Sequence, residues 1–297
     1  MIRKTNFMNK LISVLAIVTI ALATSCAQNK DYVVTIKTQY GDMVAVLYDE
    51  TPQHKANFIK LAKEHYFDST LFHRVIQDFM IQGADPDSKK AQPGQHLGMG
   101  GPGYTVPAEF NPKFFHEKGA LSAARLSDQQ NPTKASSGSQ FYIVQGSVIS
   151  NQDLDMLRVD MNKIMEGLRK MYQSQDPAFK PLFDSLNQLY ASGDQAAYNT
   201  KLASTASRVE KYTNSKVTRE LSPEKIKVYT TVGGSPHLDG DYTVFGKVIK
   251  GLDVIDKIAA QPRDPADRPV QDIRITVTVE EKSRKQITKE YGYQYPQ

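Results

Sequence analysis

Segments with β-strand character lie on both sides of a helical block, and this arrangement constrains the fold more than any other feature of the 297-residue chain. The segments that read as strands are 32–37, 43–47, two within 72–83, 119–124, 140–144, 241–248 and 270–280. Strands before and after the block must still find pairing partners in each other. The sequence therefore predicts one mainly β, antiparallel domain that is interrupted by a helical insertion.

The helical block is recognised by apolar residues at helical spacing. Such spacing runs over 154–171 and again over 179–190, and a weaker pattern covers 198–212. Ser222-Pro223-Glu224 is a helix-start signature for a shorter last helix. A stripe formed by Met161, Met165 and Met171 has two interpretations: a malleable surface for client proteins, or the apolar face of a self-packed bundle, which we favour.

These patterns divide the chain into four parts. Residues 1–25 are a signal segment, 26–148 and 228–281 form the discontinuous β domain, 149–227 form the insertion, and 282–297 form a flexible polar tail. Thr51-Pro52 opens an amphipathic segment, and Pro suits the first turn of a helix. Helices are expected over 52–65 and 252–260.

The N-terminal segment has the features of an export signal. Basic residues Arg3, Lys4 and Lys10 precede the apolar run Leu11 to Ala23. Cys26, the only cysteine, closes an Ala-Thr-Ser-Cys sequence that resembles a bacterial lipobox. We therefore expect a lipid-anchored protein of the bacterial cell envelope, with Cys26 as the acylated residue. The alternatives are an uncleaved N-terminal anchor and a free thiol.

Charge and motif content exclude several classes of function. Without the three basic residues of segment 1–25, 34 basic and 32 acidic residues remain, a net charge of +2 that gives no support for nucleic-acid binding. The six histidines show no i, i+4 pairing, so no metal site is expected. The Gly98–Gly103 stretch matches G-x-G-x-x-G but lacks the required strand before it and helix after it, so no cofactor is expected.

The stretch FHRVIQDFMIQG, residues 72–83, places a guanidinium and an amide among apolar side chains. Together with GSQFYI at 138–143 and HLDGDYTVFG at 237–246, it resembles the cyclophilin family of peptidyl-prolyl isomerases. The resemblance covers about residues 32–146 and 228–280. It implies a closed antiparallel barrel of eight strands capped by two helices.

The reaction that the resemblance implies can be argued from the chemistry of the X-Pro bond. Amide resonance sets a rotation barrier of ~18–20 kcal/mol. Twisting the bond removes the conjugation, and the prolyl nitrogen then becomes a hydrogen-bond acceptor. An arginine is a suitable donor because it stays protonated at all relevant pH values. Lowering the barrier by ~7 kcal/mol would accelerate exchange by about five decades.

By resemblance, Arg74 is the catalytic donor, and Gln82 binds the substrate backbone or steadies Arg74. The substrate-binding residues carried over from the family motifs are Phe79, Met80, Ala124, Phe141, Tyr142, His237, Leu238 and Tyr242. Strand alternation further indicates that Phe141 points into the barrel and Tyr142 toward the substrate groove. His73 is interpreted as a structural histidine.

The chain departs from the family pattern at several of these positions. His237 stands where many members have Trp, which argues against tight cyclosporin binding. Tyr242 stands where some members have His, and Tyr142 replaces a Phe. Arg125 replaces an Asn after Ala124, with little effect expected because that position mostly uses its backbone.

The resulting hypothesis is an isomerase that acts on proline-containing segments of exported proteins without a cofactor. The alternative is a non-catalytic module that binds proline peptides or acts as a chaperone, with the insertion as its partner surface. An intact set of Arg74, Phe79 and Gln82 favours catalysis.

Overall fold

The structure is a computed structural model that describes residues 29–296. The predicted signal segment and Cys26 lie outside these residues. The chain forms two compact units, described separately below. Of the described residues, the first comprises 29–114, Gly119–Gln145 and 240–296, and the second comprises Phe115–Lys118 and Gly146–Asp239. The second unit is therefore larger than the predicted insertion, 149–227, because it also includes residues 115–118, 146–148 and 228–239.

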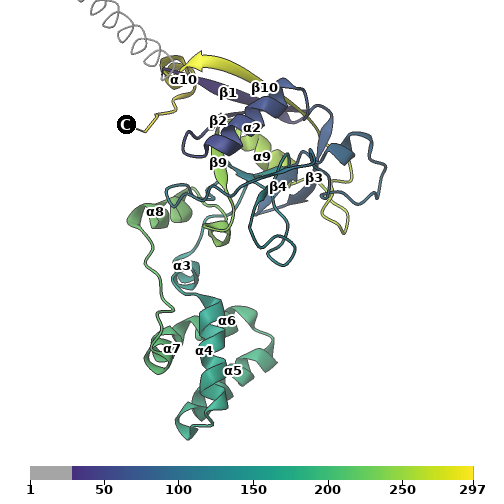
Figure 1. The fold of residues 1–297 in the computed structure, drawn as a ribbon. Helices are drawn as coiled ribbons and strands as arrows, with labels where there is room; N and C mark the ends of the chain where they lie inside the picture. The colour runs from purple at the N-terminus through teal and green to yellow at the C-terminus, as the bar shows by residue number, and fades with distance from the viewer. Residues whose placement is uncertain (1–28, 297) are drawn as a thin grey trace, which may run out of the picture. The chain divides into compact units, whose positions relative to one another are not determined.

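The first unit is a closed antiparallel barrel in the strand order β1-β10-β3-β4-β8-β6-β9-β2. Its strands are β1 (Lys30–Thr38), β2 (Gly41–Leu47), β3 (Thr70–Ile76), β4 (Met80–Gly83), β6 (Ala120–Ala123), β8 (Phe141–Val144), β9 (Val244–Lys250) and β10 (Arg274–Ser283). Figure 1 shows β1 and β10, from the two ends of the chain, side by side. A small ribbon pairs β5 (Thr105–Val106) with β7 (Ser136–Ser137). The predicted fold class, an eight-stranded antiparallel barrel, is confirmed.

The barrel is closed by pairing between segments from opposite ends of the chain. β1 pairs with β10 from Lys30↔Ser283 to Lys37↔Thr276, and β9 pairs with both β2 and β6. These are the long-range pairings that the strands flanking the insertion were expected to make. The insertion is thus accommodated between β8 and β9 without opening the barrel.

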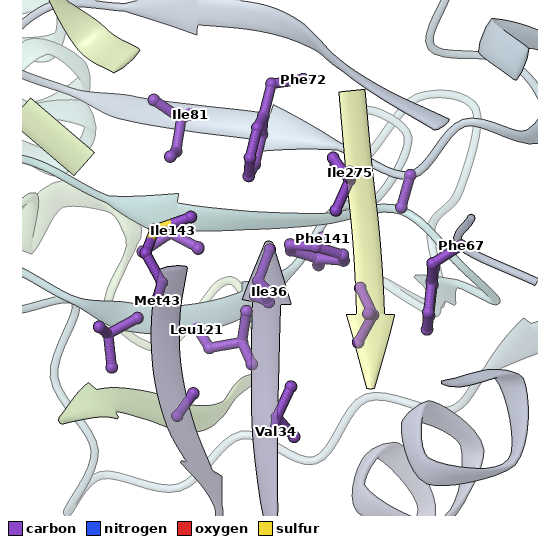
Figure 2. Packing of buried hydrophobic residues seen from close by; sticks show 14 of the residues in the cluster. Val34, Ile36, Met43, Phe67, Phe72, Ile81, Leu121, Phe141, Ile143 and Ile275 are labelled. Atoms are coloured by element: carbon purple, nitrogen blue, oxygen red, sulfur yellow. The ribbon is translucent and has the colours of Figure 1, made fainter. Parts of the chain in front are cut away.

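The inside of the barrel is filled by apolar side chains from alternate strand positions. Figure 2 shows residues of several strands, among them Ile36, Ile81, Phe141 and Ile143, converging on one interior. The Phe141 ring has aromatic contacts with three rings, including Phe58 at a centroid distance of 5.5 Å. Burial of this many apolar side chains is the main source of the barrel's stability.

Two helices add apolar faces to this core. Helix α2 (Pro52–Lys63) contributes residues such as Phe58 and Leu61, and helix α9 (Leu252–Ala259) contributes residues such as Ile255 and Ile258. Both were expected at these places. Gly251 precedes α9 at φ +86, and a Cβ there would lie 2.3 Å from a backbone oxygen, so only glycine fits this helix start.

The C-terminal segment is folded onto the barrel, so the prediction of a flexible tail from residue 282 is wrong for the described residues. β10 continues to Ser283, and helix α10 (Arg284–Tyr291) follows with a capping box between Ser283 and Gln286. Ile287 of α10 is fully buried in a cluster with Val33 and Val46. Sequence reasoning missed this because the apolar residues of the tail are few.

The second unit contains the helical insertion. Its helices are α3 (Asn151–Leu157), α4 (Met161–Gln173), α5 (Lys180–Ser192), α6 (Gln195–Ser204), α7 (Ala206–Thr213) and α8 (Pro223–Thr231). The helix expected over 154–171 is broken, because Val159 forms a β-bridge with Thr218 and the Asp160 side chain caps α4 through the nitrogen of Lys163. None of the described helices combines the length and apolar character needed to cross a bilayer.

The methionine stripe of the insertion is only partly a core feature. Met171 is fully buried in the helical core and Met161 packs against it, as a self-packed bundle requires. Met165, in contrast, is 47% exposed. It lines a groove of about 670 Å³ between α4, α5 and α6 with aromatic neighbours such as Tyr172 and Phe183.

Candidate active site

The candidate site is built on the outer side of four adjacent barrel strands. Cross-strand pairing aligns one residue from each of β3, β4, β8 and β6. We call this set the outer row; it consists of Arg74, Gln82, Tyr142 and Ser122. Directly paired residues of antiparallel strands lie on the same face of a sheet, so the barrel register alone places Arg74, Gln82 and Tyr142 side by side.

The neighbouring set of paired residues faces the opposite way. This inner row consists of Val75, Ile81, Ile143 and Leu121, and all four belong to the buried core. Because side chains alternate between the two faces, the inner row fixes the outward direction of the outer row. Arg74 and Gln82, the polar residues of the stretch 72–83, therefore belong to the outward-facing side of a sheet whose other side is buried.

Arg74 is half-exposed and only loosely held. Its Nη1 donates a hydrogen bond of 3.4 Å to Gln82 Oε1, and its Nε lies 4.0 Å from Asp267 Oδ2. Asp267 also pairs with Arg263 at 3.3 Å. The carboxylate is therefore shared between two guanidinium groups, and donor capacity of Arg74 is left for a ligand.

Gln82 and Gln140 form a short chain of amides next to Arg74. Gln82 Nε2 donates to Gln140 Oε1 at 3.2 Å, and Gln140 Nε2 donates to the carbonyl of Gly100 at 2.8 Å. This chain fixes the orientation of the Gln82 amide, whose oxygen then faces Arg74. The sequence analysis included Gln140 in the GSQFYI motif but predicted no role for it. A role could have been predicted because Gln140 lies two residues before Tyr142, and such residues of a strand face the same side.

The predicted apolar pocket residues of the first unit fall into two groups. Met80 and Tyr142 are buried at outward-facing positions of β4 and β8, and Phe79 is half-buried in the turn before β4. The prediction of Phe141 as a substrate-binding residue is wrong, because its ring points inward and packs in the core of the barrel, unlike that of the outward-facing Tyr142. The alternation argument had placed it there.

A groove of about 660 Å³ borders the outer row at Gln82. It is lined by Gln82, Ala124 and Gln140 together with the glycine-rich stretch 98–103 and parts of segments 125–131 and 135–138. Arg74, Met80 and Tyr142 do not line it. Apolar rim residues Met99 and Leu126 are 67% and 41% exposed, so the groove offers apolar surface beside the amide chain.

The glycine-rich stretch is held in place by a buried carboxylate rather than by a phosphate. Asp85 Oδ2 accepts hydrogen bonds from the backbone nitrogens of Gly98 and Gly100, at 2.5 and 3.2 Å. A Cβ at residue 100 would lie 2.1 Å from Asp85 Oδ1. The glycine is needed for this close approach, and no helix follows the stretch.

A second buried network joins helix α2 to the strand ribbon beside the groove. The Glu109 carboxylate accepts from the backbone nitrogens of Gln53 and His54, and also from His54 Nδ1 at 2.6 Å. His54 Nε2 then accepts from the Ser136 hydroxyl at 2.9 Å, because a carboxylate leaves the ring proton on Nδ1. Burial holds the pKa of His54 below its usual value, although Glu109 opposes this.

The carboxyl group of Glu109 has a lowered pKa in this network and is therefore ionised at neutral pH. Burial alone would raise its pKa, but the hydrogen bonds from the His54 side chain and from two backbone nitrogens outweigh this and lower it. The hydroxyl of Ser136 is buried with its residue, which is 2% exposed. The Ser–His–Glu arrangement is therefore a structural support and not a nucleophile.

Leu238 and His237 belong to the second unit, in the short 3-10 helix η3 (Pro236–Leu238). Leu238 is buried and His237 is exposed. The next residue, Asp239, accepts from His116 Nδ1, Tyr229 Oη and Lys225 Nζ at 2.9, 2.8 and 2.7 Å. Burial would raise the pKa of Asp239, but these partners hold it below its usual value. The corner that carries Leu238 is thus anchored to helix α8.

His73 is buried beside Arg74 in sequence, and neither of its ring nitrogens makes a hydrogen bond of normal geometry. Burial is the main cause that lowers its pKa to about 4. A ring held neutral and enclosed is a structural residue, as interpreted from the sequence. No group of His, Cys, Asp and Glu side chains suited to a metal ion occurs within residues 29–296.

Comparison with known proteins gives this site a family. The sequence model described as "Cyclophilin type peptidyl-prolyl cis-trans isomerase/CLD" matches residues 33–178 and 211–280. The chain belongs to the cyclophilin family. As a cyclophilin it is an enzyme of the peptidyl-prolyl isomerase class, and the resemblance inferred from the three motifs is confirmed.

Individual relatives agree with this assignment. A "Putative peptidyl-prolyl cis-trans isomerase" of Staphylococcus saprophyticus is 32% identical over 243 residues, which cover 80% of this chain and 86% of the relative. A "Putative bifunctional phosphatase/peptidyl-prolyl cis-trans isomerase" of Streptococcus pyogenes is 30% identical over 82% of this chain, which spans 37% of that longer protein.

A solved structure is also similar. It is a cyclophilin type peptidyl-prolyl cis-trans isomerase of Cryptosporidium parvum, crystallised in the presence of the dipeptide Ala-Pro. It is 20% identical and covers 84% of this cyclophilin and 98% of its own chain, with a TM-score of 0.46.

The neutral state of buried His73 predicts a loss of stability in mild acid. In the unfolded chain the pKa is near 6.5, whereas it is about 4 in the folded protein. Protons therefore bind preferentially to the unfolded chain as the pH falls below 6.5, which costs roughly 2 kcal/mol of folding free energy between pH 7 and pH 5. We expect His73→Leu to reduce that decrease by about this amount in urea denaturation.

The control for this experiment is His96→Leu, since His96 is exposed in a loop. This substitution should leave the pH dependence of the wild type unchanged. An equal pH dependence in wild type and His73→Leu would contradict a neutral, buried ring at position 73.

Proposed function

We propose that this cyclophilin catalyses rotation about X-Pro bonds by donating a hydrogen bond from Arg74 to the prolyl nitrogen of the twisted amide. The observation that supports it most is the outer row, which sets the half-exposed Arg74 guanidinium against Gln82 and in line with Tyr142. A permanent cation on the rim of an apolar surface is suited to a reaction in which only the twisted state offers a nitrogen lone pair.

The remaining residues of the site have supporting roles in this proposal. Met80, Tyr142 and the half-buried Phe79 provide apolar surface for the pyrrolidine ring. Gln82, oriented by Gln140, offers its amide to the substrate backbone or keeps Arg74 in place. Each hydrogen bond that is stronger in the twisted state than in the planar states lowers the barrier, and no covalent step is needed.

The proposed mechanism predicts a large loss of turnover when the donor is removed. Removing one preorganised donor from a site of this kind typically costs about 10²–10³ in rate. Arg74→Ala should therefore lower kcat/KM for a proline tetrapeptide by about that factor while the protein stays folded. Exchange is measured with the cis and trans peptide resonances by NMR.

Arg208→Ala serves as the matched control, because Arg208 is exposed on α7 in the second unit. Its activity should equal that of the wild type. If Arg74→Ala and wild type catalyse exchange equally fast, the assigned role of Arg74 is wrong; if neither does, the protein is a binding module.

We further propose that its clients are exported proteins and that Cys26 carries a lipid anchor in the cell envelope. The support is the sequence alone: a basic segment, an apolar run and the Ala-Thr-Ser-Cys sequence. Cys26→Ser should move the protein from the membrane fraction to the soluble fraction of a bacterial expression host, and metabolic labelling with palmitate should be lost. Labelling that persists in Cys26→Ser would contradict the anchor.

A second candidate function is the holding of unfolded clients by the insertion. It is favoured by the groove in which Met165 and Tyr172 are 47% and 67% exposed among other apolar and aromatic residues. The occupant would be an apolar, proline-containing segment of an unfolded chain, because flexible Met and aromatic surfaces adapt to varied apolar sequences.

The double variant Met165→Ser/Tyr172→Ser tests this candidate. It should weaken suppression of aggregation of a denatured test protein at least about threefold, while prolyl exchange on a tetrapeptide stays at the wild-type rate. Lys163→Ser, which changes an exposed residue of the same helix, is the control. Unchanged suppression in the double variant would exclude the groove as a holding surface.

A further inference from the structure

Arg125 lines the groove at a position where the family pattern has Asn. It directly follows Ala124, yet its side chain is only 5% exposed. Nε donates to the carbonyl of Asp241 at 2.8 Å, and Nη1 donates to the carbonyl of Leu126 at 3.0 Å and to Asp128 Oδ1 at 2.5 Å. Two of the three guanidinium nitrogens therefore donate within the protein, so the side chain of residue 125 matters as well as its backbone.

The same guanidinium stacks on an aromatic ring that leads to the candidate pocket. Its central carbon lies 4.4 Å from the centroid of the Tyr242 ring. The Tyr242 ring in turn meets the Tyr142 ring edge to face, with centroids 6.0 Å apart and planes at 82°. Arg125, Tyr242 and Tyr142 thus form a continuous stack from the groove wall to the outer row.

Ion pairs tie the loop that follows Arg125 to the same place. Lys134 pairs with Asp241 and lies 3.7 Å from Asp128. Hydrogen bonding to Asp241 raises the pKa of Lys134, and hydrogen bonding from Arg125 lowers the pKa of Asp128. Both ends of loop 126–134 are joined in this way, and the loop supplies Leu126, Gln130 and Asn131 to the groove.

The contacts in this cluster are not equally important. Asp128 and Asp241 are 61% and 47% exposed, and exposed ion pairs contribute little to stability. The Arg125 side chain itself is only 5% exposed, and its stack on Tyr242 and its two backbone hydrogen bonds depend on a planar group with several donors. Lysine cannot reproduce that combination.

We propose that Arg125 is a positioning residue that holds Tyr142 and the groove wall in the geometry for binding X-Pro peptides. This inference rests on the proposed function. The proposed role differs from the sequence-based expectation, in which Arg at position 125 has little effect because the position mostly uses its backbone. The stack touches the apolar surface of the pocket and not the Arg74 donor, so its loss should weaken peptide binding and leave the chemical step nearly unchanged.

Kinetics on a proline-containing octapeptide separate these effects. Arg125→Ala should raise KM about tenfold, equivalent to about 1.4 kcal/mol of binding, while kcat stays within about twofold. Arg125→Lys should raise KM nearly as much, because the stack and the backbone hydrogen bonds are lost. Asp128→Asn and Arg208→Ala should both behave like the wild type. Full activity in Arg125→Lys, or an unchanged KM in Arg125→Ala, overturns the proposal.

A structural readout excludes a general loss of stability as the cause. The protein is labelled with 3-fluorotyrosine, and the Tyr142 resonance is assigned with Tyr142→Phe. This resonance should shift in Arg125→Ala and Arg125→Lys and stay in place in Asp128→Asn and Arg208→Ala. A raised KM with an unmoved Tyr142 resonance contradicts the positioning role.

The test also separates this inference from the proposed function. If the wild type shows no turnover, the isomerase proposal fails, and the dissociation constant for the same octapeptide replaces KM as the readout. A weaker dissociation constant in Arg125→Ala then supports the positioning role, and equal constants or no binding to the wild type overturn it.

Discussion

The register of β3, β4, β8 and β6 is the constraint on which the rest of the first unit depends. One set of paired residues, the inner row, fills the barrel interior, and the adjacent outer row faces outward with Arg74, Gln82 and Tyr142. A shift of one residue would exchange the two sets and place a guanidinium in the core, at a cost comparable with the stability of a typical domain. Packing of the core therefore fixes the geometry of the site.

Buried polar networks position the loops that the barrel does not. Asp85 holds the glycine-rich stretch, Glu109 and His54 join α2 to the ribbon beside the groove, and Asp239 anchors the corner that carries Leu238. Each carboxylate accepts several hydrogen bonds, which repay much of its desolvation. These groups have no direct part in the proposed reaction. Within the first unit, Asp85 and the Glu109–His54 pair hold segments beside the groove in place.

The fold and the central site residues could be predicted from the sequence because their signals are local. Period-two alternation marks strands, and the three motifs occur in the strands and turns that carry Arg74, Gln82 and Tyr142. Alternation even indicated that Phe141 belongs to the core, although the family motif placed it among the binding residues. The family resemblance implied the closed barrel and its two capping helices, whereas the strands on both sides of the insertion indicated only that they must pair with each other.

The parts that could not be predicted depend on contacts between distant segments. The role of Arg125 requires Asp241 and Tyr242, more than 110 residues away in the sequence. Helix α10 is stabilised by Val33 and Val46, which no local pattern in the tail reveals. The break between α3 and α4 results from a bridge between Val159 and Thr218. Each case is a tertiary contact that overrides a weak local preference.

The central claim is that Arg74 donates to the prolyl nitrogen of a ring bound against the outer row. The most direct test is a high-resolution crystal structure of the protein with a proline-containing peptide. The account predicts a guanidinium nitrogen of Arg74 at about 3 Å from the prolyl nitrogen, with the ring in contact with Met80 and Tyr142. A peptide whose proline lies elsewhere, or whose prolyl nitrogen faces away from Arg74, would contradict it.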